Sequence, residues 1–182
     1  MDRVRDSRDL AQGSSFTARR ARELVQKAGQ LQSTDDIDVM FPDKNLEAAV
    51  REDLDRPKGP LTRGHLKRMK ELELNDEVHY KAIEDLTGLE HAVNLASLHI
   101  QANLISDVSP LASLTKLTTL DLLFNQISDV SPLASLTNLI NLDLRDNQIS
   151  DVSPLASLTN LTELRLNDNQ ISDVSPLASL TN

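Results

Sequence analysis

The second half of the chain repeats itself with a fixed period. The phrase QISDVSPLASLTN occurs three times, and the segment from Leu95 divides into four units of 22 residues. Each unit follows the pattern L-x-x-L-x-[LI]-x-x-N-x-I-x-D-V-S-P-L-A-S-L-T-x. A period of this length is typical of solenoids, in which each repeat packs mainly on its neighbours. The four units are residues 95–116, 117–138, 139–160 and 161–182.

Each unit predicts one strand and one short helical segment. In unit 117–138, Leu120 and Leu122 alternate with other positions, as in a strand with one buried face. Ser131 before Pro132 predicts a helical or 3₁₀ turn with Ser131 as its N-cap. About seven buried apolar side chains contribute roughly 10–20 kcal/mol, whereas ordering the backbone costs roughly 1–2 kcal/mol for each residue. One unit is therefore unstable alone, and we expect the units to stack.

Two polar columns run through the units. The first, just past each strand, is expected to form a ladder of side-chain hydrogen bonds to the backbone. The second is expected to accept hydrogen bonds from turn N–H groups, with cation binding by its carboxylates as the alternative. The first column is Asn103, Asn125, Asn147 and Asn169, and the second is Asp107, Asp129, Asp151 and Asp173.

The pattern L-x-x-L-x-L-x-x-N-x-I over residues 95–182 resembles that of leucine-rich repeats. Its 22-residue form with I-S-D-V-S-P-L-A-S-L-T is similar to the bacterial internalin-type subclass. The resemblance implies an α/β fold: a right-handed solenoid with a curved parallel sheet on its concave face and a helical N-terminal cap. It also implies a bacterial origin and a role in protein binding.

The residues before the repeats predict three further parts. Residues 1–38 are a polar tail and linker with a possible amphipathic helix from Thr17 to Leu31, which either packs on the next element or docks on an acidic partner or membrane. Residues 39–68 resemble the internalin cap, with a helix over Phe41–Leu54. Residues 69–94 form an irregular first coil of 26 residues, whose extra residues should bulge around Val78–Lys81, and Glu77 takes the place of the ladder asparagine.

Composition excludes several classes of function. The chain has no cysteine, which excludes disulfides and thiolate chemistry. Its net charge of −9 argues against nucleic acid as a partner. No apolar run is long enough to span a membrane, and Met1 is not followed by a signal peptide. We therefore expect a cytoplasmic protein, or a secreted or cell-surface one if the true N-terminus precedes Met1.

The histidines show no metal-ligand spacing, and no serine, histidine and acid stand out as a triad. We expect no enzyme activity, no catalytic residue, no metal and no cofactor. The histidines are His65, His79, His91 and His99.

The repeat units differ from one another mainly at their strand positions, which line the concave face. Leu123 and Phe124 are two large apolar residues in a polar row, a pattern typical of a binding hot spot. The alternative is that Phe124 folds onto a neighbouring coil and fills a gap. The predicted partner-binding residues are His99, Gln101, Asp121, Leu123, Phe124, Asp143, Arg145, Asp146, Arg165, Asn167 and Asp168.

Unit 161–182 should expose part of its core and a free strand edge. This predicts either a fragment of a longer array or self-association through that coil. Three hypotheses for function follow: a non-enzymatic module that binds an unidentified protein through the concave face, a structural segment of a larger multidomain protein, or a recognition arm for an active part beyond Asn182.

Overall fold

The computed structural model describes residues 33–74 and 82–181. The chain divides into two units, Met1–Asp36 and Ile37–Asn182. The described part of the first contains a 3₁₀ helix, η1 (Thr34–Asp36). The second contains the repeats and the helices that precede them, and the sections below concern this unit.

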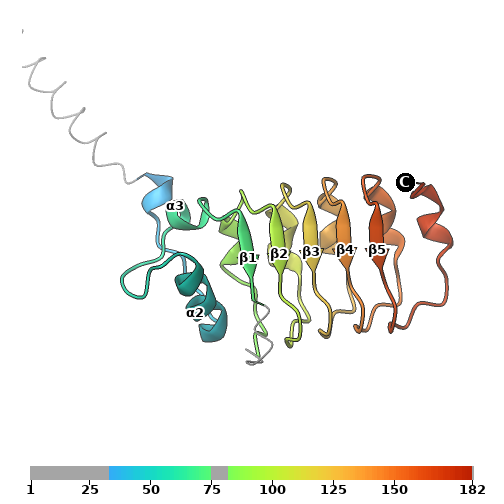
Figure 1. Ribbon diagram of the computed structural model, residues 1–182, viewed down its shortest axis with the longest axis horizontal. Coiled ribbons are helices and arrows are strands. Elements are labelled where there is room, and N and C mark those ends of the chain that lie inside the picture. Colours follow the sequence, from blue (N-terminus) through green and yellow to red (C-terminus); the bar gives the residue numbers. More distant parts are fainter. Residues whose placement is uncertain (1–32, 75–81, 182) are drawn as a thin grey trace, which may run out of the picture. The chain divides into compact units, whose positions relative to one another are not determined.

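Five parallel strands form one sheet in the order β1-β2-β3-β4-β5 (Figure 1). Each strand is paired in register with the next, so that Leu72, Leu98, Leu120, Leu142 and Leu164 occupy equivalent positions. Each strand has three residues, and from β2 onward the asparagine of the first column stands four residues after the strand ends. Their bounds are β1 (Glu71–Glu73), β2 (Ser97–His99), β3 (Thr119–Asp121), β4 (Asn141–Asp143) and β5 (Glu163–Arg165).

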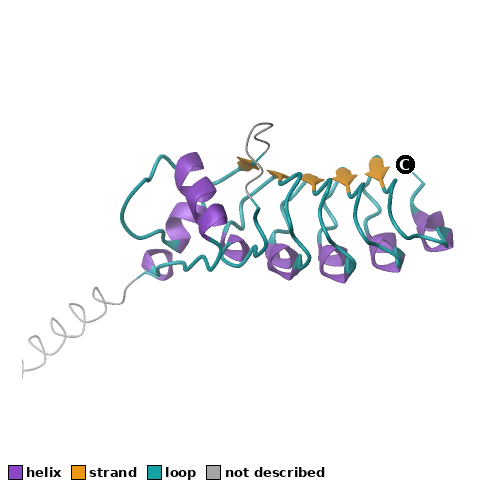
Figure 2. Ribbon diagram, turned by 90° about the horizontal axis from the view of Figure 1, so that it is seen from below, coloured by secondary structure: helices purple, strands orange, loops and turns teal. Residues whose placement is uncertain are grey.

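A row of 3₁₀ helices lies on the side of the solenoid opposite the strands (Figure 2). The prediction of Ser131 as an N-cap was wrong: Ser131 is the first residue of its helix, and the carboxylate of Asp129 accepts the Ser131 N–H at 2.8 Å. All four aspartates of the second column make this contact, which confirms their turn role. The helices are η2 (Leu89–His91), η3 (Ser109–Ser113), η4 (Ser131–Ser135), η5 (Ser153–Ser157) and η6 (Ser175–Ser179).

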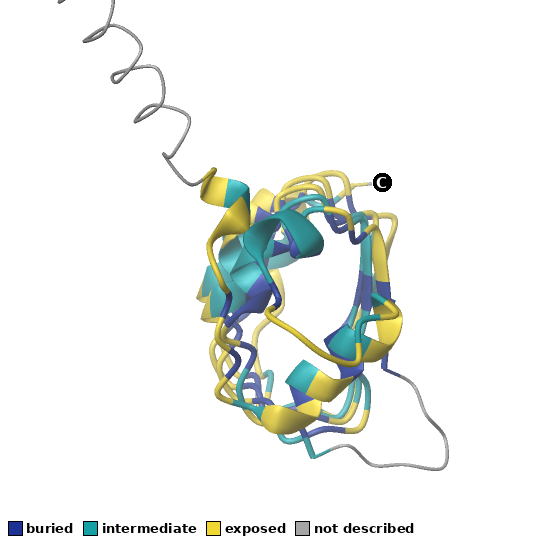
Figure 3. Cartoon of the chain, turned by 90° about the vertical axis from the view of Figure 1, so that its left-hand side faces the viewer, coloured by how far each residue is buried: buried dark blue, intermediate teal, exposed yellow. Residues whose placement is uncertain are grey.

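The core is a stack of aliphatic layers, one from each coil. In the second repeat, Leu120, Leu122 and Ile127 meet Val130 and Leu133, and all five are buried. Figure 3 looks along the coils and shows buried residues recurring at the same places around them. Because every layer repeats the same side chains, the apolar rows are continuous from one coil to the next.

The asparagine column forms the predicted ladder. The side-chain oxygen of Asn125 accepts the N–H of Ile105 in the preceding coil at 3.1 Å. Its amide group donates to the carbonyls of Ile100 and Leu122, both at 3.0 Å. Asn103, Asn125 and Asn147 are buried, so each joins two coils where water does not reach the backbone.

Two further ladders link neighbouring coils. The hydroxyl of Ser135 donates to the carbonyl of Ala112 at 2.7 Å, and Ser157 repeats this contact one coil later with Ala134. The amide of Asn138 donates to the carbonyl of Thr115 at 2.8 Å. These contacts also join neighbouring coils, but they lie at the exposed surface instead of in the buried core.

The predicted cap contains the helices α2 (Lys44–Asp53) and α3 (Arg63–Leu66). Asp43 is the N-cap of α2, and its Oδ1 accepts the N–H groups of Asn45 and Leu46. Its Oδ2 accepts the N–H groups of Glu84 and Asp85 in the first coil. One carboxylate thus starts the cap helix and attaches it to the solenoid.

Gly88 shapes the contact between the cap and the first coil. It stands where later coils have proline, its φ is +108°, and a Cβ there would lie 2.6 Å from the ring of Phe41. Phe41 is buried. The glycine is therefore required both by the backbone conformation and by the close approach of the aromatic ring.

The last coil is less covered than the others. Leu164, Leu166, Ile171, Leu177 and Leu180 are only partly buried, and Val174 is 62% exposed. This agrees with the half-exposed core predicted for residues 161–182.

Three predictions lie outside the described residues: the helix over residues 17–31, the bulge at residues 78–81 and the role of Glu77. Among the described helices, none is long and apolar enough to cross a membrane.

Replacing Asn125 by alanine should lower the free energy of unfolding by about 2–4 kcal/mol, because it leaves the buried Ile105 N–H without a partner. The matched control is Asn169→Ala in the half-exposed last coil, where water replaces the lost contacts and a loss of about 1 kcal/mol is expected. Urea unfolding measures both. Equal losses would contradict the buried ladder as the source of the stability.

Replacing Asp43 by alanine should cost about 2 kcal/mol near pH 7, through loss of the helix cap and of the contacts to the first coil. Burial raises the pKa of Asp43, but the backbone N–H groups of Glu84, Leu46, Asp85 and Asn45 outweigh it, and the pKa is lowered.

A lowered folded pKa means that this stability is present above the unfolded pKa of about 4 and is lost as the pH falls through the folded value. Denaturation curves of Asp43→Ala and the unsubstituted protein should therefore converge below about pH 4. A difference that stays constant with pH would contradict the role of the charge.

Candidate functional site

The concave face is formed by side chains of the strands and of the residues that follow them. Because the parallel strands are in register, equivalent residues of successive coils form rows, and neighbouring residues within a row are about 4.8 Å apart. The described residues of this face are Glu71, Glu73, Ser97, His99, Gln101, Ala102, Thr119, Asp121, Leu123, Phe124, Asn141, Asp143, Arg145, Asp146, Glu163, Arg165, Asn167 and Asp168.

Phe124 is the most exposed large apolar residue of this face. It is 57% exposed, so it does not fill a gap between coils, and that alternative is wrong. Leu123 beside it is half-buried, which corrects the expectation that both residues are exposed. A single aromatic ring therefore projects from the face.

The backbone of Phe124 is in the left-handed conformation, with φ at +55°. The equivalent residues Ala102, Asp146 and Asp168 share this conformation, with φ of +53°, +52° and +58°. The turn is held by the neighbouring coils, since Phe124 N–H donates to the Arg145 carbonyl and its own carbonyl accepts from Asn103. Aspartate tolerates this conformation, whereas a bulky aromatic residue is rare there.

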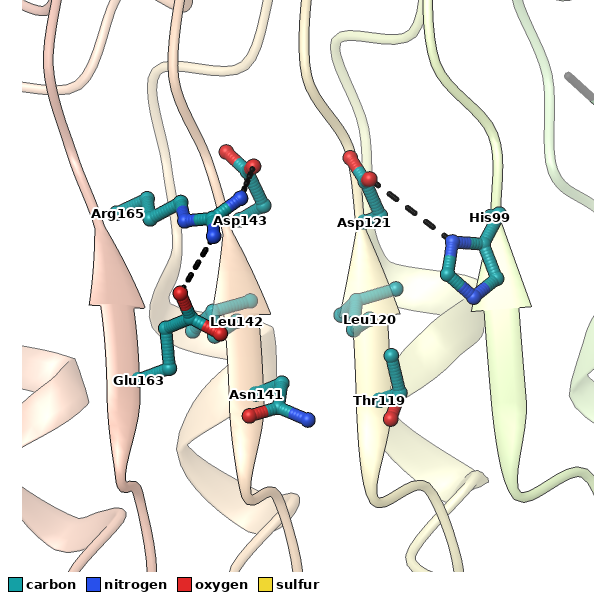
Figure 4. A pocket seen from close by; sticks show the side chains of 9 residues that line it. All are labelled: His99, Thr119, Leu120, Asp121, Asn141, Leu142, Asp143, Glu163 and Arg165. Carbon is teal, nitrogen blue, oxygen red and sulfur yellow. Dashed lines mark hydrogen bonds and ion pairs between the residues drawn. The ribbon is translucent and has the colours of Figure 1, made fainter.

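A charged network lies beside Phe124 on the last two strands. Arg145 donates to Asp143 at 2.6 Å, and Arg165 lies 3.5 Å from Asp143 and 2.5 Å from Glu163. Figure 4 shows Arg165 between the two carboxylates. Burial raises the pKa of Asp143, but hydrogen bonds and charge from Arg145, with the charge of Arg165, outweigh it and lower the pKa.

A second polar group lies on β2 and β3. The ring of His99 is 3.8 Å from the carboxylate of Asp121 (Figure 4). Gln101 donates to the same carboxylate at 2.5 Å, and the N–H of Leu123 bonds it as well. Asp121 is thus fixed by its neighbours rather than free to rotate.

A shallow cavity of about 180 Å³ lies over β2–β5 and joins the two polar groups. Buried Leu120 and Leu142 form its floor, and polar side chains form its walls. The lining residues are His99, Thr119, Leu120, Asp121, Asn141, Leu142, Asp143, Glu163 and Arg165.

The structure places the predicted partner-binding residues on one face, and Asp143 is a second correction besides Leu123. Asp143 was expected to be exposed but is buried, at 7% exposure, because the two arginines cover it. Arg165, Asn167 and Asp168 are exposed, and the remaining predicted residues besides Phe124 are half-buried.

A second groove, of about 480 Å³, lies just before the strands and was not predicted. Ile140 is 42% exposed in it, between Thr118 and Thr162 at the equivalent positions of the neighbouring coils. The available signal was an isoleucine at a repeat position that is alanine in the first unit and threonine in the second and fourth.

The described part of the chain holds no group of three or more His, Cys, Asp or Glu residues that could bind a metal ion. The aspartates of the second column each bond the turn of their own coil. The site therefore offers contact surface, hydrogen bonds and charge.

Comparison with known proteins agrees with the repeat architecture described above. A family model for leucine-rich repeats in two copies matches residues 93–135 and 137–179. No curated protein matches the chain.

Solved structures of Listeria monocytogenes internalins are similar to the chain. InlF shares 37% identity at a TM-score of 0.72, over 77% of this chain and 41% of that one. InlC2 shares 31% identity at a TM-score of 0.56, over 78% of this chain and 91% of that one. InlJ shares 25% identity at a TM-score of 0.60, over 78% of this chain and 35% of that one. The chain thus spans less than half the length of the InlF structure.

The stacked coils, parallel sheet and asparagine ladder define a leucine-rich-repeat protein, a class whose concave surfaces are used for binding. Within that class the chain belongs to the bacterial internalin-type family.

Replacing Asp143 by asparagine should lower the free energy of unfolding by about 1–3 kcal/mol, because both arginines lose a covered partner. The matched control is Glu163→Gln, which removes one charge from an exposed pair and should change stability by less than about 0.5 kcal/mol. Guanidinium unfolding measures both. If the two substitutions have the same effect, the Asp143 network does not stabilise the fold.

Proposed function

We propose that this chain is a non-enzymatic module that binds another protein through its concave face, with Phe124 as the central anchor. The observation that carries the proposal is that Phe124 is exposed and has a left-handed backbone conformation, which is unfavourable for a bulky aromatic residue.

The conformation of Phe124 is costly for the fold. A residue with a side chain pays about 1–2 kcal/mol in the left-handed region, and asparagine or aspartate pays less. The exposed ring recovers little of this by packing. Strain that the fold does not need is a reason to look for function at that residue.

The surroundings of Phe124 suit a protein partner. Exposed aromatic anchors ringed by polar groups are the usual form of a binding hot spot. Arg145 and Asp121 are already held by hydrogen bonds to neighbouring side chains. A partner therefore meets polar groups whose conformational entropy is already partly lost, which favours affinity.

A second candidate is a recognition or structural segment of a larger multidomain protein whose active part lies beyond Asn182. The observation that favours it is that the chain spans 41% of the InlF structure. In the purely structural form of this candidate, no partner binds at Phe124.

The decisive variant is Phe124→Asn, studied with the binding protein that is recovered by affinity capture and then purified. Loss of the anchor should weaken the dissociation constant by about 30-fold or more, while relief of strain should leave the melting temperature unchanged or raised by a few degrees. Calorimetric titration and thermal unfolding measure the two effects.

The matched control is Ile140→Asn, which also replaces an exposed apolar residue but lies in the groove before the strands. It should leave the dissociation constant unchanged. Unchanged binding by Phe124→Asn, or a large fall in its melting temperature, would reject the anchor.

A further inference from the structure

A short segment of the cap has a charge opposite to that of the rest of the chain. Residues 56–70, RPKGPLTRGHLKRMK, contain six lysines and arginines, one histidine and no acidic residue. Residues 71–182 contain four basic and sixteen acidic residues. The six cations of this basic segment are Arg56, Lys58, Arg63, Lys67, Arg68 and Lys70.

The fold exposes three of these six cations. Leu61, Leu66 and Met69 are buried and fix the basic segment to the end of the core. Lys58, Arg68 and Lys70 are exposed. Within the described part of the chain, these three form no ion pair.

The cations also lie close to one another. The pKa of His65 is lowered by burial and by the charges of Arg56 and Arg68. The pKa of His91 is lowered, since burial and the charge of Arg63 outweigh the opposing effect of Glu90. The Nε atoms of Arg56 and Arg63 are buried without a hydrogen-bond partner. Positive charge therefore exceeds negative charge here, although Asp38 lies opposite Thr62 and Glu90 lies beside His91.

An apolar strip, interrupted by the exposed carboxylate of Asp38, runs beside the basic segment. Val39 N–H donates to the carbonyl of Leu61 and Arg63 N–H to the carbonyl of Ile37, so the two stretches run antiparallel. Met40 is 76% exposed and Ile37 is 38% exposed. The antiparallel pairing places Met40 alongside Pro60, which is also exposed.

From this juxtaposition we propose that the cap is a peripheral docking surface for an anionic lipid bilayer. Lys58, Arg68 and Lys70 contact the headgroups, and Met40 enters the boundary between headgroups and acyl chains. Basic side chains next to an exposed apolar residue are the combination that anionic membrane surfaces attract. The surface is separate from the concave face, and the proposal does not depend on the function proposed above.

The apolar strip favours a lipid surface over other anions. Nucleic acids and acidic proteins also attract cations, but a chain of phosphates gives Met40 no apolar environment. A bilayer supplies both, since burying apolar side-chain carbon at the interface adds to the attraction by charge.

The test is co-sedimentation of the full chain with vesicles of phosphatidylcholine alone or with about one third phosphatidylglycerol. Binding is expected only to the anionic vesicles and should weaken with salt. Lys58→Gln with Arg68→Gln should weaken it roughly 30-fold. The control, Lys116→Gln with Arg165→Gln, removes two charges from the repeats and should leave binding unchanged.

Met40→Gln keeps the net charge and should weaken vesicle binding about fivefold. It should leave any binding to double-stranded DNA or polyglutamate unchanged, which separates a lipid surface from a general anion site. The proposal is overturned by equal binding to neutral vesicles or by equal effects of the two charge-removing pairs. It is also overturned if Met40→Gln has no effect on vesicle binding, or if binding persists in the cap variant, which would assign it to residues 1–33.

Discussion

Each coil of this protein depends on the next to satisfy its backbone. A segment of 22 residues with a three-residue strand has many N–H and C=O groups without a partner in the same coil. The parallel sheet bonds part of them, and the side chains of Asn125, Ser135 and Asn138 bond others in the preceding coil. Because an unpaired buried backbone group costs about 1–3 kcal/mol, the buried asparagine ladder is as necessary as the leucine layers.

The ladders leave the strand side chains free to vary. Ladder residues such as Asn125 and Ser135 each have a partner in a neighbouring coil, so changing one disturbs two coils. The side chains of Phe124, Arg145 and Arg165 lie outside these ladders. Their identity is therefore constrained only by their neighbours on the concave face and by what binds there. The cap is the exception to the repeat: Asp43 and Gly88 fit α2 and Phe41 onto the first coil, and the same region carries the basic segment.

The repeat made most of the fold predictable. Its period indicated the coils, the alternation of leucines indicated the strands, and the asparagine column indicated the ladder. The burial of Asp143 was not predictable from its own position, because it results from Arg145 and Arg165 covering it from the same strand and from the next. Ser131 was predicted to be an N-cap because a helix start of Ser-Pro resembles one, but it is the first residue of its helix and donates its N–H to Asp129. The left-handed backbone of Phe124 could not be predicted from the residue type, because this conformation is imposed by a turn that occurs at the same position of each repeat unit.

The constancy of the scaffold has a consequence for the gene. If one whole 22-residue unit is removed or duplicated, the sequence at the new junction still follows the repeat. Each ladder side chain then has the same kind of partner in its new neighbouring coil. The number of coils is therefore free to drift by unequal recombination without a new folding problem. Where the unit lies between the cap and Phe124, the change alters the distance between the cap and the aromatic ring in steps of about 4.8 Å, so that spacing is a quantity on which selection can act directly.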